Sequence, residues 1–78
     1  MNRIKVESST IAEVGFDYEN KILEVKFNKG AVYHYFDVPD HEVFYLIFAK
    51  SIGSHFMGKI AKVYKYKQIG NEENLYQI

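Results

Sequence analysis

The sequence predicts a single α+β domain: a three-stranded antiparallel sheet in consecutive order, covered on one face by two short helices. Two segments joined by Asn28-Lys29-Gly30 show the alternation or residue types of β-strands, and a third such segment precedes them. After the one proline, Pro39, the pattern changes to apolar runs that fit helices. With 78 residues and 47% hydrophobic composition, the chain has room for one small core.

The first third of the chain predicts one full strand and a weaker segment before it. Residues 1–7 alternate weakly and fit either a short edge strand or an ordered arm. Residues 10–18 predict a strand in which every second residue is apolar. Gly15 lies inside this strand and indicates a bulge or a close approach of another backbone segment. The predicted inner face holds Ala12, Val14, Phe16 and Tyr18.

The hairpin loop decides which face of the following strand is buried, because the register fixes the side-chain faces. A two-residue loop places Tyr33 and Tyr35 on the polar face, whereas a three-residue loop places them on the apolar face. Gly30 is third in the loop, and glycine adopts a positive φ without strain, so we predict the three-residue loop. The predicted neighbours are Tyr33 with Val25, Tyr35 with Leu23, and His34 on the outer face with Glu24 and Lys26.

Pro39 ends the sheet, because proline cannot donate a hydrogen bond to a neighbouring strand. Asp40 then fits the N-cap of a helix that we predict over residues 41–50. The apolar residues of this segment leave almost no polar face, so we expect the helix to be nearly enclosed. We expect Phe44 and Ile47 to pack on the sheet.

We predict that Gly53 ends the first helix and that a second short helix follows. Ser54 fits the N-cap of this second helix, and residues 55–61 form its body. Phe56 and Ile60 are four residues apart, so both lie on the same, inner side of this helix.

The last part of the chain alternates lysine with tyrosine and then becomes polar. Residues 62–67 fit either a further strand or the end of the second helix. We expect residues 70–78 to form a flexible C-terminal tail. Residues 1–69 are therefore predicted to form the single domain.

In their order along the chain, these landmarks resemble the KTSC domain, a short family that takes its name from the C-terminus of some lysyl-tRNA synthetases. The resemblance covers about residues 6–64, and the ordered set carries it rather than any single motif. Phe16 and Met57 depart from the pattern, since the family often has tyrosine and asparagine there. The matching residues are Val6, Ser8, Ser9, Ile11, Val14, Gly15, Phe16, Asp17, Leu23, Val25, Phe27, Gly30, Tyr33, Tyr35, Val38, Pro39, Ala49, Ser51, Gly53, Phe56, Ile60 and Tyr64.

The resemblance implies a domain with no established activity. RNA binding has been proposed for the family from its synthetase context, which is an association rather than a mechanism. The motif residues are expected to be structural, in turns, caps and core. They are Gly30, Tyr33, Tyr35, Pro39, Ser51, Gly53 and Phe56.

Composition and motif spacing argue against catalysis, metal binding and membrane insertion. The chain has no cysteine, which excludes disulfides, thiolate chemistry and cysteine-ligated zinc. His34, His41 and His55 lack metal-ligand spacing, and Ser54 and His55 are neighbours that point apart on a helix. We therefore expect a non-enzymatic protein without metal or cofactor. The longest apolar run is too short to span a bilayer, so we expect a cytoplasmic protein.

Four lysines interleaved with two tyrosines form the densest basic group of the chain, although the formal net charge is zero. Lysines can neutralise phosphates, and exposed tyrosines can stack on unpaired bases. The plain alternative is a solvated lysine face with tyrosines that pack inward. The six candidate binding residues are Lys59, Lys62, Lys65, Lys67, Tyr64 and Tyr66.

These observations favour a small binding module, with single-stranded or structured RNA as the first candidate partner. The alternative is a protein-interaction module that uses the exposed side of the sheet, around Val32 and Phe36, or a sheet edge. Affinity that falls sharply with salt would favour RNA, whereas binding that survives salt would favour a protein.

Overall fold

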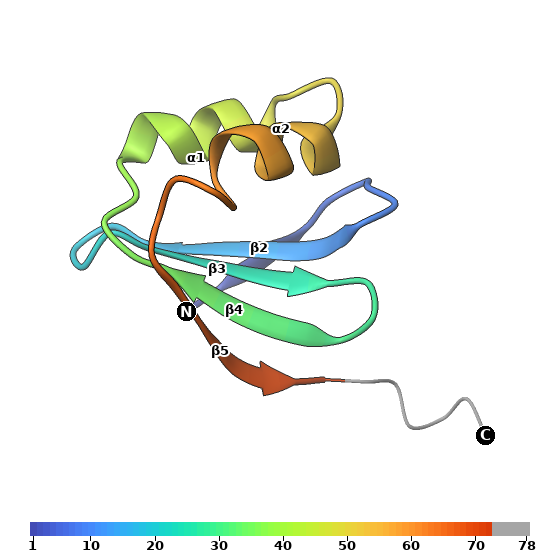
Figure 1. The fold of residues 1–78 in the computed structure, drawn as a ribbon, viewed down its shortest axis with the longest axis horizontal. Helices are drawn as coiled ribbons and strands as arrows, with labels where there is room; N and C mark the ends of the chain where they lie inside the picture. The colour runs from blue at the N-terminus through green and yellow to red at the C-terminus, as the bar shows by residue number, and fades with distance from the viewer. Residues whose placement is uncertain (73–78) are drawn as a thin grey trace.

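The sheet in the computed structural model is antiparallel and holds five strands in the order β1-β2-β3-β4-β5. Both helices lie on one face of the sheet, as Figure 1 shows. The structure describes residues 1–72. The elements are β1 (Arg3–Lys5), β2 (Ile11–Asp17), β3 (Ile22–Phe27), β4 (Ala31–Tyr35), α1 (Asp40–Ile47), α2 (Ile52–Lys59) and β5 (Tyr66–Asn71). The α+β class and the helices on one face are as predicted, but the prediction of three strands is wrong.

The central hairpin of β3 and β4 has the predicted register. Tyr33 lies opposite Val25, and Tyr35 lies opposite Leu23. The loop glycine, Gly30, has a φ of 108°, and its N–H donates to the carbonyl of the last β3 residue at 2.9 Å. A side chain at this φ would be strained, so glycine is what allows the loop that turns both tyrosines toward the helix layer.

The edge strands β1 and β5 are the part of the sheet that the three-strand prediction omitted. For residues 1–7 the structure selects the edge strand, with Ile4 opposite Val14. At the other edge, residues 62–67 are partly a turn and partly strand, because β5 begins at Tyr66. All six residues of β5 are exposed, so its sequence lacks the apolar–polar alternation of a half-buried strand.

The sheet also extends past the predicted domain boundary at residue 69. Gly70 and Asn71 belong to β5, and the backbone N–H of Glu72 donates to the carbonyl of Gly30 at 2.6 Å. The first three residues of the predicted tail are therefore attached to the domain. Residues 73–78, the rest of that tail, lie outside the described residues.

Gly15 marks a close approach, one of the two alternatives that the sequence left open. A Cβ at this position would lie 2.8 Å from the backbone carbonyl oxygen of Asn2, where β1 passes beside β2. The bulge of β2 is elsewhere, between Ile11 and Glu13. Because of it, Ile11 and Val14 are both buried, and the predicted alternation from Ala12 fails at this end of the strand.

Helix α1 is rotated and shorter than predicted. The N-cap of α1 is Pro39, and Asp40 makes no capping hydrogen bond. The Asp40 carboxylate instead faces Lys21 Nζ at 3.3 Å. Val43 and Leu46 are buried, Ile47 is partly buried against the core, and Phe44 is 60% exposed. The prediction that Phe44 packs on the sheet is therefore wrong, because a run of consecutive apolar residues does not define the rotation of a helix.

Helix α2 begins three residues earlier than predicted. Ser51 is its N-cap, and its hydroxyl accepts from the backbone N–H of Ser54 at 3.3 Å. The predicted cap, Ser54, and Gly53 both lie in its first turn, so Gly53 does not end α1. Phe56 and Ile60 are buried as predicted. In the described part of the chain, no helix is long and apolar enough to cross a membrane.

Candidate functional site

The predicted lysine and tyrosine cluster does not form one surface. Lys67 lies opposite His34 on the outer face of the sheet, whereas Tyr66 lies opposite Tyr35 on the helix side. Tyr64 packs against the core, and burial, followed by the nearby negative charge of a glutamate, raises the pKa of its phenol. The tyrosine that stays exposed, and so available for stacking, is Tyr66, at 59%.

The lysines of the cluster are likewise divided among different surfaces. Met57 of α2 lines the groove described below, and Lys59 follows it by two residues. Two residues of a helix correspond to about 200° of rotation, so the side chains of Met57 and Lys59 point in nearly opposite directions. Lys62 and Lys65 are exposed in the segment that connects α2 to β5. Lys67 lies on the outer face of the sheet, so the four lysines do not share one face.

Three tyrosines from β4 and β5 form a continuous aromatic surface on the helix side of the sheet. The ring centroid of Tyr66 lies 5.7 Å from that of Tyr33 and 5.7 Å from that of Tyr35, and Tyr33 and Tyr35 are stacked at 6.3 Å. Tyr35 is only 4% exposed, and burial raises the pKa of its phenol to about 12. We call Tyr33, Tyr35 and Tyr66 the tyrosine surface.

An open groove of about 610 Å³ runs between the tyrosine surface and α2. It exists because the helices lie over the β2 and β3 side of the sheet, while β5 extends away from them (Figure 1). Phe27 and Phe56 lie in the groove with their rings in edge contact, 5.5 Å apart, and Met57 lines it from α2. We call this feature the tyrosine groove.

The polar lining of the tyrosine groove is neutral apart from one lysine. It comes from the β3–β4 loop, through Asn28 and Lys29, and from Ser9 and Thr10 before β2. Lys29 is the one charged residue among the lining residues of the described chain, and no acid lines the groove. A surface of this kind suits a ligand with a flat apolar part and a negative charge.

A smaller hollow of about 390 Å³ adjoins the groove and shares Ser9, Thr10 and Met57 with it. Two of its hydroxyl groups, those of Ser8 and Ser51, already have structural partners. The Ser8 hydroxyl accepts from the backbone N–H groups of Thr10 and the following residue at 3.1 and 3.2 Å, and Ser51 caps α2. Gly53 lies close to Thr10, because a Cβ on Gly53 would be only 3.2 Å from the Thr10 hydroxyl oxygen. The absence of a side chain at Gly53 permits this close approach.

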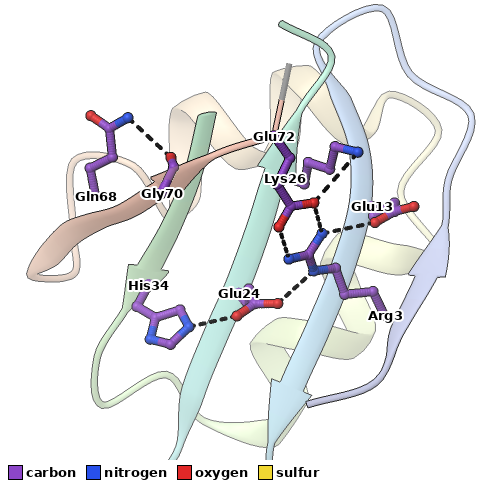
Figure 2. Close-up of polar contacts among 8 residues, drawn as sticks. All are labelled: Arg3, Glu13, Glu24, Lys26, His34, Gln68, Gly70 and Glu72. Atoms are coloured by element: carbon purple, nitrogen blue, oxygen red, sulfur yellow. Dashed lines mark hydrogen bonds and ion pairs between the residues drawn. The ribbon is translucent and has the colours of Figure 1, made fainter. Parts of the chain in front are cut away.

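The outer face of the sheet carries an ion-pair network, which Figure 2 shows. Arg3 lies at its centre and pairs with three carboxylates, Glu13 at 3.0 Å, Glu72 at 2.7 Å, and Glu24. His34 Nε2 is 2.7 Å from Glu24 Oε1. These contacts satisfy the guanidinium of Arg3 and raise its pKa further, so it is not available as a free cation for a ligand.

The histidines do not assemble a metal site in the part of the chain that the structure describes. His34 bonds Glu24 on the outer face, and the ring of His41 lies 5.9 Å from that of Tyr45 on α1. Within residues 1–72, no three histidine, aspartate or glutamate side chains are close enough to hold a metal ion.

Comparison with known proteins identifies the family. The model of the KTSC domain matches residues 7–66, which is most of the chain. The chain belongs to the KTSC domain family. A crystal structure of a KTSC domain protein from Yersinia pestis superimposes with a TM-score of 0.86 at 33% identity, over 88% of this chain and 97% of that one.

Two curated relatives differ in their overall length. An uncharacterized protein of Stutzerimonas stutzeri is 45% identical over 56 residues, which are 72% of this chain and 79% of that protein. A lysine–tRNA ligase of Nostoc punctiforme is 33% identical over 66 residues, 85% of this chain. The matched segment is only 12% of the ligase, so the KTSC-like part is a small portion of that enzyme.

Sequence reasoning singled out the groove tyrosines and Phe56 but did not assign Lys29 or Met57 to a site. The predicted register already turned Tyr33 and Tyr35 toward the helix layer, and Tyr66 was a candidate. Lys29 was considered only as a loop residue and Met57 only as a departure from the family pattern. The missing information was the position of β5, because Tyr66 lines the groove only once this strand is paired with β4.

Proposed function

We propose that this KTSC domain is a small non-catalytic module that binds single-stranded RNA in the tyrosine groove. The observation that carries the proposal is the pairing of the exposed Tyr66 ring with a groove whose single charged lining residue is Lys29. Bases stack on aromatic rings whatever their sequence, and lysines neutralise the phosphates between them. A groove open along one side admits an unpaired strand but not the interior of a duplex.

The basic residues near the groove extend this argument. Lys62 and Lys65 are exposed in the segment that runs from Ala61, a lining residue, to Tyr66. Neither lysine lines the groove itself, but both lie in the chain between its α2 end and Tyr66, while Lys29 lies at the hairpin end. The name of one relative, a lysine–tRNA ligase, supports an RNA ligand by association only, since this chain matches 12% of that enzyme.

The test is a titration of a labelled single-stranded RNA of about ten nucleotides, at low and at near-physiological salt. Tyr66→Ala should weaken binding by roughly 5- to 150-fold, the equivalent of about 1–3 kcal/mol of stacking. Tyr18→Ala is the matched control, because Tyr18 is 66% exposed and does not line the groove. Wild type that fails to bind at low salt, or equal losses in both variants, would reject the proposal.

A pair of lysine variants separates groove contacts from general attraction. Lys29→Gln should weaken binding and lower the slope of log affinity against log salt by about one, as expected for one lost phosphate contact. Lys67→Gln removes the same charge from the outer face of the sheet and should change the affinity little. A larger loss from Lys67→Gln would place the RNA on the outer face instead.

A protein partner is the second candidate, and the exposed aromatic residues of α1 favour it. The outer face of the sheet, which the sequence suggested for this role, is less suitable. Val32 is only 1% exposed there, and the neighbouring charges are paired with one another. A partner bound through α1 would leave the affinity for RNA unchanged, because α1 contributes no residue to the tyrosine groove.

A further inference from the structure

Helix α1 turns a row of large aromatic side chains away from the core. Phe44 and Tyr45 are each 60% exposed, and Phe48, directly after the helix, is 76% exposed. The rings of Phe44 and Phe48 are stacked, with centroids 5.8 Å apart. The opposite side of the same helix buries Val43 and Leu46, so the exposed ring surface is an additional apolar face. We call Phe44, Tyr45 and Phe48 the α1 aromatic face.

The size of this face is that of an interaction surface. A buried Phe or Tyr removes about 150–250 Å² from water, so these exposed fractions correspond to roughly 300–500 Å² on each copy. Scattered exposed apolar residues are normal, but a contiguous patch of this size on a small protein is often functional. Two copies would bury roughly 600–1,000 Å², which is at the low end of specific interfaces.

The charges at the two ends of the face make it complementary to itself. Asp40, Phe44 and Phe48 follow one another at four-residue spacing and so lie in one row, with the acid at the N-terminal end. Lys50 is exposed just beyond the other end of the row. When two such rows meet antiparallel, Asp40 of each copy lies near Lys50 of the other, and the helix dipoles oppose favourably. The Asp40 carboxylate also faces Lys21 Nζ of its own chain at 3.3 Å, but both side chains are exposed, so this intramolecular pair is weak and leaves the carboxylate open to a second cation.

We propose that two copies of this chain associate through the α1 aromatic face, with their α1 helices antiparallel about a two-fold axis. A two-fold axis brings the same patch of both copies together, and the row from Asp40 to Lys50 fits that arrangement. The small area makes the dimer weak and dependent on concentration. The tyrosine groove is formed by other elements and stays open in the dimer.

Sedimentation equilibrium of the full chain over a wide concentration range tests the proposal. Wild type should pass from monomer to dimer mass as its concentration rises. Phe44→Gln with Phe48→Gln should raise the dissociation constant at least about tenfold, because both rings lie at the centre of the contact. Tyr18→Gln, at an exposed aromatic outside α1, is the control and should dimerise like wild type. Circular dichroism of each variant confirms that it is folded.

The antiparallel arrangement has its own test. Lys50→Glu places an acid opposite Asp40 of the other copy and should weaken the dimer, whereas adding Asp40→Lys to it should restore association. A wild type that stays monomeric at every concentration overturns the proposal. So does a dimer that is unaffected by loss of both phenylalanines, or one that Lys50→Glu does not weaken.

Discussion

Glu24 shows how one residue can be polar, buried and still stabilised. Among residues 1–72 it is the one charged residue that is buried, with 7% of its surface exposed. Burial by itself raises the pKa of its carboxyl, but hydrogen bonds from Arg3 and His34 and the charge of Arg3 outweigh this and lower the pKa overall. The ionised form is therefore favoured in the folded protein.

The fold should lose stability in acid, and Glu24 should be responsible for part of that loss. A carboxyl whose folded pKa is below its unfolded pKa stabilises the fold above the unfolded value, and the stabilisation disappears as the pH falls through the folded value. We expect the melting temperature to fall as the pH drops below about 4.5, the ordinary pKa of a glutamate carboxyl, and to fall less in Glu24→Gln. An equal fall in both proteins would show that Glu24 does not contribute.

The tyrosines show what could and could not be read from the sequence at the scale of single residues. The loop glycine predicted the face of Tyr33 and Tyr35 correctly, because φ at Gly30 restricts the loop type. The division between Tyr64, which packs on the core, and Tyr66, which is exposed, depends on where α2 ends and β5 begins. Element ends depend on tertiary packing, which the local pattern does not contain.

At the scale of elements, the hairpin loop gives a direct prediction. Gly30→Val should destabilise the fold by about 1–2 kcal/mol or more, because a β-branched residue resists the positive φ of 108°. Gly58→Ala is the control at an exposed position of α2, where a Cβ meets no atom within 4 Å, and it should stabilise the fold by about 0.5–1 kcal/mol. Chemical denaturation measures both, and an unchanged Gly30→Val protein would contradict the loop geometry.

The rotation of α1 gives a second prediction at this scale. Leu46→Ala should cost about 2–5 kcal/mol, because Leu46 is fully buried beneath the helix. Phe44→Ala, two residues away and exposed, should change stability by only about 0.5 kcal/mol. The sequence favoured the opposite outcome for Phe44, since five apolar residues close together leave the buried side undefined. Comparable losses from both variants would mean that the helix is rotated from the position described.

At the scale of the whole molecule, the fold class follows from local patterns but the sheet edges do not. β1 is three residues long, and β5 has no buried residue, so neither carries a strong strand signal. Both are attached by long-range contacts, including the ion pairs of Arg3 with Glu13 and Glu72. The groove depends on the β5 edge, because β5 supplies Tyr66 and a three-stranded sheet would lack this wall.

The central claim is that the tyrosine groove is the RNA-binding surface, and backbone amide NMR measures it directly. We predict that single-stranded RNA shifts amide signals most at Lys29, Tyr33, Met57 and Tyr66, the residues that line the groove. The signals of Phe44 on α1 should stay in place. Shifts centred on α1 or on the outer face of the sheet, or no shifts at low salt, would contradict the account.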